Sequence, residues 1–127
     1  PKDCLAVKVV CEGKTLVYTS DTAWFTGMEE FAAGADLLIA ECSLYPGHDG
    51  DTAGHMTSRD VSRLAEAARP EHLLLSHLPA YGDPRILLVD VSAHWDGRVS
   101  LASKLMQVDL AGEGSQNVSL HSCVSNR

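Results

Sequence analysis

The most constraining feature of this 127-residue chain is the segment EHLLLSHL, which begins at Glu71 and ends at Leu78. Its apolar residues are consecutive rather than alternating with polar ones, which is typical of a strand buried on both faces. The segment TSRDVSRLAEAARP comes directly before it and has the pattern of an amphipathic helix. We expect Thr57 to cap the N-terminus of this helix, Asp60 to complete a capping box and Pro70 to end the helix. A helix followed by a doubly buried strand indicates the α/β class.

The remaining segments alternate strands and helices in the same way. Two β-rich runs, Leu5 to Val10 and Thr15 to Thr19, are separated by CEGK, in which Gly13 can supply the positive φ of a tight hairpin loop. Further along the chain, we expect a short helix from Gly27 to Ala33 closed by Gly34, a strand from Asp36 to Ala40, a helix capped by Asp83 with Pro84 as its first residue and ending near Trp95, and two short strands between Arg98 and Leu110.

The segment from Cys42 to Met56 has neither helical nor strand periodicity and predicts a long loop. Long loops in compact domains are often functional, so this segment is of interest. It contains a cluster formed by His48, Asp49 and Asp51. Polar loop residues are usually solvated, and we interpret this cluster as exposed side chains rather than metal ligands.

Length and charge narrow the functional classes. The chain has the size of one modest domain, and we expect residues 1–110 to form it and residues 111–127, rich in Gly, Ser and Asn, to be a disordered tail. Ten Lys and Arg stand against seventeen Asp and Glu, and the basic residues are scattered, which argues against a nucleic-acid partner. The four cysteines form no CxxC pair, which favours reduced thiols in a cytoplasmic protein. No apolar run approaches the ~18 residues of a membrane span.

Four polar residues stand at the ends of predicted elements. Asp21, Glu41 and His77 each follow a strand, and His55 comes just before a helix N-terminus. In α/β sheets, ligand sites form beyond the carboxyl ends of the strands, so we expect these side chains to converge. Carboxylate and imidazole groups bind Zn, Mn or Fe, and a carboxylate can bridge two ions. The pattern therefore makes Asp21 a candidate metal ligand.

Taken singly, each residue also has a simpler structural interpretation. Asp21 lies in SDT, which is a good turn or helix-cap sequence, and His55 is compatible with an ordinary loop histidine. Glu41 and His77 follow buried strands, where each needs a charge or hydrogen-bond partner nearby. Cys42 fits a small buried apolar role better than that of a soft ligand. Three other histidines are interpreted as structural: His72, His94 and His121.

Taken in order, YTSDT, ADLLIAECS and GHMTSRDVSRLAEAARPEHLLLSHL resemble the carboxyl-terminal half of a metallo-β-lactamase-fold hydrolase. Within that superfamily the motifs are most similar to the ribonuclease Z and phosphodiesterase-like branch. The resemblance covers roughly Leu5 to Leu110 and implies one half of an αββα sandwich, with one sheet and outer helices. It implies a metal-dependent hydrolase of a small phosphodiester or related ester.

The resemblance also implies roles for the four polar residues. Asp21 corresponds to the aspartate that bridges two divalent metal ions, expected to be Zn with Mn or Fe as alternatives, and His77 to the last histidine ligand. Glu41 and His55 correspond to the catalytic pair that handles a proton near the scissile phosphate, with the glutamate orienting the histidine. A helix beginning at Thr57 is expected to direct its positive end at an anionic phosphate.

The sequence departs from this branch in several motifs. Ser20 stands where the family usually has Gly, Ala40 replaces a His, and Cys42 and Met56 replace small residues. These changes remove none of the four candidate residues. Together with the acidic charge, they argue against true transfer-RNA processing.

The largest departure is the absence of the family's His-x-His-x-Asp-His run from these 127 residues. The stretch GHDGDTAGH has the wrong order and lies in the wrong loop. Two ligands cannot complete a dinuclear site, so we expect this chain alone to be inactive. It begins at Pro1 and enters a strand at once, as expected of a piece cut from a longer hydrolase. The expected partner is the missing amino-terminal half or a second copy, and the alternative is a non-catalytic binding or assembly module that retains the fold.

Overall fold

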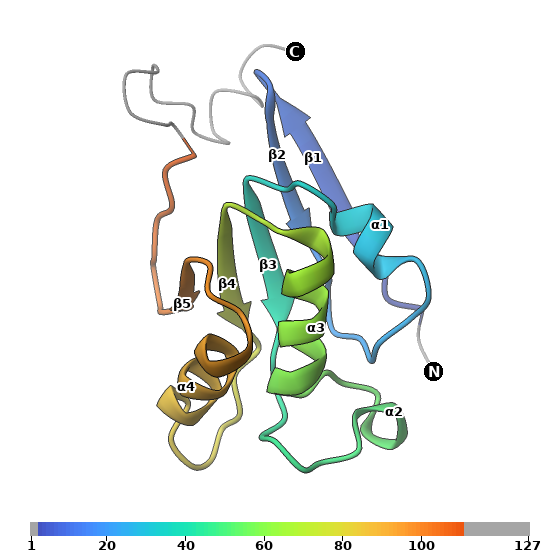
Figure 1. Ribbon diagram of the computed structural model, residues 1–127, viewed down its shortest axis with the longest axis vertical. Helices are drawn as coiled ribbons and strands as arrows, with labels where there is room; N and C mark the ends of the chain where they lie inside the picture. Colours follow the sequence, from blue (N-terminus) through green and yellow to red (C-terminus); the bar gives the residue numbers. More distant parts are fainter. Residues whose placement is uncertain (1–2, 111–127) are drawn as a thin grey trace.

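The computed structural model describes residues 3–110, which form a five-stranded sheet with helices on one side (Figure 1). The strands lie in the order β1-β2-β3-β4-β5, so each strand pairs with its neighbours in the chain. β1 and β2 are antiparallel, and the other three pairs are parallel. The elements are β1 (Val7–Cys11), β2 (Lys14–Tyr18), α1 (Met28–Ala32), β3 (Leu37–Glu41), α2 (Gly50–Ala53), α3 (Ser58–Ala68), β4 (His72–Ser76), α4 (Arg85–His94) and β5 (Val99–Leu101).

The hairpin between β1 and β2 is formed by a two-residue loop. Cys11 pairs with Lys14, and the intervening Glu12 and Gly13 have φ values of 49° and 75°. Two successive positive φ angles define the type I′ turn, whose twist matches that of the flanking strands. The predicted hairpin and the role of Gly13 are confirmed.

Helices α1, α3 and α4 pack on the same face of the sheet (Figure 1). The parallel strands follow one another in a single direction, so connections of the usual right-handed kind bring every helix to that face. Val17 and Leu38 of the sheet lie in one buried cluster with Leu64 of α3 and Val91 of α4. Burying one leucine of this kind contributes about 2 kcal/mol, so this cluster is the main source of stability.

The β4 strand is buried on both faces, as its continuous apolar run predicts. Leu73 and Leu75 belong to the main cluster under the helices, whereas Leu74 lies on the opposite face. That opposite face carries a second, smaller cluster, and no described helix belongs to it. Its members are the buried Leu16, Leu37 and Leu74 and the partly buried Val9, Ile39, Ala102, Val108 and Leu110.

The α3 helix begins and ends as its sequence predicts. The Thr57 hydroxyl accepts from the backbone N–H of Asp60 at 3.2 Å, and the Asp60 carboxylate accepts from the backbone N–H of Thr57 at 2.9 Å. This is a reciprocal capping box. At the other end, Arg69 adopts a left-handed conformation with φ 50°, and Pro70 prevents continuation. The N-terminus of α3, next to His55, is thereby fixed.

Three expectations about helices and strands differ from the structure. Of two strands expected between Arg98 and Leu110, only β5 forms among the described residues, because the chain turns after it through a hydrogen bond from Met106 N–H to the Ser103 carbonyl. The loop predicted between Cys42 and Met56 contains the one-turn helix α2, capped by Asp49. The last helix begins at Arg85, one residue later than predicted, and Pro84 occupies its N-cap position.

The remaining expectations concern thiols, membrane spans and the tail. Cys4 and Cys42 carry free thiols, whereas Cys11 is disulfide-bonded, so the expectation of reduced thiols is wrong for Cys11. Within residues 3–110, every helix is too short or too polar to cross a bilayer. The tail predicted for residues 111–127 lies outside the described residues.

Candidate active site

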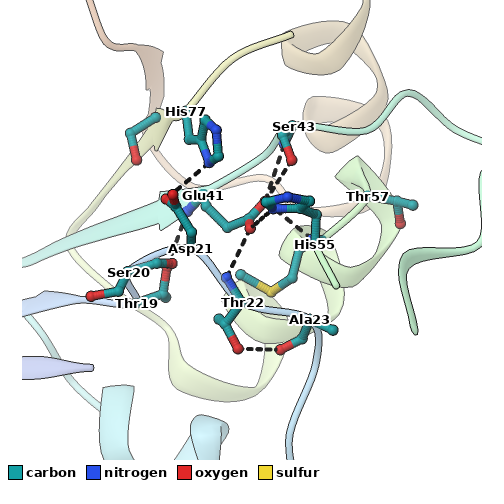
Figure 2. A network of polar contacts seen from close by, with 12 residues as sticks. Thr19, Ser20, Asp21, Thr22, Ala23, Glu41, Ser43, His55, Thr57 and His77 are labelled. Atoms are coloured by element: carbon teal, nitrogen blue, oxygen red, sulfur yellow. Dashed lines mark hydrogen bonds and ion pairs between the residues drawn. The ribbon is translucent and has the colours of Figure 1, made fainter. Parts of the chain in front are cut away.

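The four residues singled out from the sequence lie together at the carboxyl ends of the parallel strands (Figure 2). Asp21 follows β2, Glu41 ends β3, His77 follows β4, and His55 precedes α3. They form two His–carboxylate pairs, Glu41–His55 and Asp21–His77. The rings of His55 and His77 join the two pairs, with their centroids 5.1 Å apart in an edge-to-face arrangement.

Glu41 is completely buried and accepts five hydrogen bonds. Its Oε1 accepts from Thr22 N–H at 2.8 Å and lies 2.6 Å from Nδ1 of His55. Its Oε2 accepts from Ser43 N–H at 3.3 Å, Ser43 Oγ at 3.0 Å and Met56 N–H at 3.1 Å. A carboxylate has about four lone-pair positions, so no acceptor position of Glu41 remains for another ligand.

His55 is held by this saturated carboxylate. An ionised carboxylate only accepts hydrogen bonds. Nδ1 of His55 is therefore assigned the ring hydrogen and donates a hydrogen bond to Glu41. The other ring nitrogen, Nε2, is then the one left for exchange with a ligand. The side chain of His55 is 33% exposed, so the ring is oriented from inside the protein and accessible from outside.

The Asp21–His77 pair is more open. Nδ1 of His77 lies 2.9 Å from Oδ1 of Asp21, and the two side chains are 42% and 48% exposed. Neither carboxylate oxygen of Asp21 accepts a further hydrogen bond within the part of the chain that the structure describes. Oxygen and nitrogen atoms with free lone pairs therefore remain in this pair, unlike in Glu41.

Two residues of this edge have left-handed backbones. Ser20, directly before Asp21, has φ 58°, and His77 has φ 48°. A non-glycine residue in this region costs of order 1 kcal/mol, so the fold holds both conformations against strain. At Ser20, the hydroxyl offsets part of the cost by donating to the Leu5 carbonyl at 2.6 Å. Glycine adopts a left-handed φ without steric cost. This explains why the family that the sequence resembles usually has Gly at the position of Ser20.

Ligand atoms of Glu41, His55 and His77 lie within 4.8 Å of one another, which is close enough for a metal ion. The hydrogen bonds of Glu41 argue against this particular trio, because a metal bond to Glu41 would displace one of its five donors. Asp21 and His77 fit a divalent cation better, since their donor atoms are exposed and of the types that Zn, Mn and Fe accept.

Most backbone amides around the α3 N-terminus already have acceptors within the protein. Thr57 N–H donates to Asp60 and Ser58 N–H to the Leu44 carbonyl. Asp60 N–H donates to Thr57, and Met56 N–H to Glu41. The expectation that the positive end of α3 acts on an anionic phosphate stays a prediction.

Residues that support Glu41 were not found from the sequence. Thr22 and Ser43 donate to its carboxylate, and the Thr19 hydroxyl accepts from its backbone N–H at 3.0 Å. Thr22 is separated from Glu41 by 19 positions in the sequence, and Thr19 by 22 positions. No local pattern marks them. Only the hydroxyl of Ser43, two residues after a buried acid, is a sequence signal that points to such a partner.

The other polar candidates lie outside the cluster. Asp49 caps α2, and its side chain accepts from the Thr52 hydroxyl and then from Thr52 N–H, which lowers the pKa of Asp49. His72 is buried and bonds Ser100 at 2.9 Å, and His94 bonds the Asp90 carbonyl at 2.7 Å. Burial, and then the Glu41 charge, raise the pKa of Cys42 to about 12, so this thiol stays protonated and is a poor ligand.

A family model described as a beta-lactamase superfamily domain matches residues 1–78 of this chain, a range that contains all four site residues. The chain belongs to the beta-lactamase superfamily. Its fold is that of the metallo-β-lactamases. The crystal structure of the metallo-beta-lactamase fold protein YhfI from Bacillus subtilis superposes with a TM-score of 0.77 at 37% identity, over 80% of this chain and 42% of YhfI.

Two further proteins are similar to this chain. A ribonuclease Z of Brevibacillus brevis is 37% identical over 75 residues, which cover 56% of this chain and 23% of that enzyme. Human tRNase Z, short form, has a TM-score of 0.62 at 23% identity, over 82% of this chain and 37% of its own, and shows the shared fold. The chain spans less than half the length of each of these relatives.

Proposed function

We propose that this chain supplies one half of the active site of a metal-dependent hydrolase acting on a phosphodiester or related ester. The observation that carries the proposal is the pairing of a buried, fully hydrogen-bonded Glu41–His55 with an exposed Asp21–His77 at the same sheet edge. The first pair has the properties of an oriented proton donor. The second has the properties of an incomplete cation site.

In this proposal Asp21 and His77 hold divalent cations, Zn by expectation and Mn or Fe as alternatives. Such cations, when bound, supply Lewis acidity and lower the pKa of water toward neutrality. His55, protonated on both ring nitrogens, lies beside the leaving group and gives its Nε2 proton to the leaving oxygen as the phosphorus–oxygen bond breaks. Water adds to phosphorus at the same time and releases one proton to the solvent, from which His55 is protonated again. Glu41 keeps the ring oriented and stabilises its protonated form through the 2.6 Å contact at Nδ1.

The substrate class rests on relatives and on charge. Relatives named ribonuclease Z support a phosphodiester. The formal net charge of −7 and the scattered basic residues favour a small ester over a long RNA.

Completion of the site requires groups from outside this chain. Two metal ligands are fewer than the three or more that each catalytic metal ion takes from a protein. The second sheet face, which carries Leu16, Leu37 and Leu74, is the natural place for the missing amino-terminal half, or for a second copy, to pack. If neither binds, the chain fits the alternative function, a binding or assembly module that retains the fold.

The first test separates these two functions. The reading frame upstream of Pro1 is translated and searched for the His-rich ligand run. The complete zinc-loaded protein is then assayed with bis(p-nitrophenyl) phosphate, a lactone and a thioester. We expect phosphodiester hydrolysis, lost in Asp21→Asn and reduced about a hundredfold or more in His55→Gln. Asp51→Asn, an exposed residue outside the site, is the matched control and should keep full activity. Absence of hydrolysis of all three substrates contradicts the proposal.

A further inference from the structure

The two segments that carry His55 and His77 are joined by Tyr45. Its hydroxyl donates to the backbone carbonyl of Tyr81 at 2.6 Å, and the two aromatic rings pack edge to face with centroids 5.6 Å apart. Burial, and then the Asp83 carboxylate, raise the pKa of Tyr45, so the phenol keeps its proton and remains a donor. Tyr81 follows His77 by four residues, so this contact fixes the loop that begins at His77.

Tyr45 is also coupled to His55 through its chain neighbour Leu44. Leu44 N–H donates to the Met56 carbonyl at 3.3 Å, and Ser58 N–H donates to the Leu44 carbonyl at 3.3 Å. These bonds form a parallel β-bridge between Leu44 and Thr57. Met56 is the residue directly after His55. A displacement of Tyr45 therefore moves Leu44 and, through the bridge, changes the position of the His55 imidazole.

Gly82 completes the contact. It has φ 74°, and a Cβ atom at this position would lie 2.6 Å from the hydroxyl oxygen of Tyr45. Both the backbone conformation and the space therefore require glycine here. The tyrosine hydroxyl, the Tyr81 carbonyl and the bare Gly82 backbone form a close-packed unit, which we call the Tyr45 contact.

We propose that Tyr45 is a positioning residue, which holds His55 and His77 at their mutual distance by tying together the two loops that carry them. The proposal rests on the proposed function for its catalytic consequence, but its structural part stands independently. Tyr45 makes no hydrogen bond or ring contact with His55 or His77 and acts through the backbone of the two loops.

The test compares Tyr45→Phe with Tyr81→Phe. The first variant removes the donating hydroxyl and keeps the ring. The second removes a hydroxyl that makes no hydrogen bond within residues 3–110 and keeps the accepting carbonyl. In the 127-residue chain, we expect Tyr45→Phe to weaken the NOE between the ring protons of His55 and His77. We also expect amide exchange at Leu44 and Ser58 to become about three- to tenfold faster, as for loss of one hydrogen bond. Gly82→Ala should weaken the same NOE and speed exchange at the same two amides by a larger factor.

In the complete enzyme, the proposal predicts that Tyr45→Phe lowers kcat about three- to tenfold with little change in KM, because binding groups remain but the two pairs are misaligned. Tyr81→Phe should match the wild type throughout. Unchanged NOEs, exchange rates and kcat in Tyr45→Phe overturn the proposal, as do equal effects in both variants. The NOE can weaken in Tyr45→Phe even if the wild-type enzyme shows no hydrolytic activity. That result supports the positioning role of Tyr45 and overturns the proposed function instead.

Discussion

Two His–carboxylate pairs, one with Glu and the other with Asp, occupy one sheet edge and differ in burial and in hydrogen bonding. In the Glu41–His55 pair the carboxylate is fully buried and has four donors besides the histidine. In the Asp21–His77 pair both side chains are roughly half exposed, and the contact between them is 2.9 Å rather than 2.6 Å. Burial with donors fixes a carboxylate and uses up its lone pairs, whereas exposure leaves lone pairs for a cation. Composition alone does not decide what such a pair does.

The largest expected difference between the pairs is in folding stability. Glu41→Ala leaves the buried N–H group of Met56 and the partly buried N–H groups of Thr22 and Ser43 without an acceptor. We expect it to lower the free energy of unfolding by about 3–5 kcal/mol. Asp21→Ala removes an exposed ion pair and should change it by less than about 1 kcal/mol. Urea unfolding followed by circular dichroism measures both. Similar losses in the two variants would show that the pairs do not differ as described.

Metal binding should distinguish the pairs in the opposite direction. In the complete protein, Asp21→Asn should weaken zinc binding by about a hundredfold or more, because it removes a ligand charge. Glu41→Gln keeps the size of the side chain and should leave the zinc stoichiometry unchanged. Isothermal titration with zinc after chelation provides the measurement. Loss of zinc in Glu41→Gln alone would make Glu41 a ligand and reverse the assignment.

Thiol reactivity tests how closed the region around Glu41 is. Cys42 follows Glu41, is fully buried and has its pKa raised to about 12, whereas Cys4 is exposed. At pH 8 we expect iodoacetamide to modify Cys42 at least about a hundredfold more slowly than Cys4, because thiolate is the reactive form. Peptide mass spectrometry over time gives both rates in one sample. Comparable rates would indicate that the Glu41 region opens readily.

His72 provides the smallest effect and shows what burial does to a histidine without a carboxylate. Burial, and then the charge of Arg98, lower the pKa of His72 from the ordinary value of 6.5. A lowered folded-state pKa favours the neutral form, so its contribution to stability is complete above 6.5 and is lost as pH falls through the folded-state value. Between pH 7.5 and 5.5, wild type should lose slightly more stability than His72→Gln. An equal loss in urea unfolding would contradict this.

Much of the fold could be predicted because its determinants are local. The capping box of Thr57 and Asp60, the turn at Gly13 and the apolar run of β4 each involve residues close in sequence. The convergence of Asp21, Glu41, His55 and His77 also followed from a general rule, since the ends of parallel strands share one edge. Their assigned roles remain predictions until the assays are done.

What could not be predicted depends on contacts distant in sequence. Thr22 becomes a support of Glu41, 19 positions further along the chain, only when β2 and β3 pair, and Tyr45 meets Tyr81 across 36 positions. The second strand expected before Leu110 had suitable residues, but in the described chain the turn at Ser103–Met106 follows β5 instead. Local sequence favours a strand, but the strand forms only where a neighbouring strand is available to pair with it.

The left-handed backbone of His77 governs which substitutes a mutagenesis programme can use at that position. With φ 48°, Asn and Gly can replace it without added backbone cost, while Val, Ile and Thr would misfold the loop whatever their chemistry. A saturation library screened for activity would therefore sort first by backbone tolerance and only then by metal affinity. His77→Asn is the variant in which a lost activity can be attributed to the imidazole.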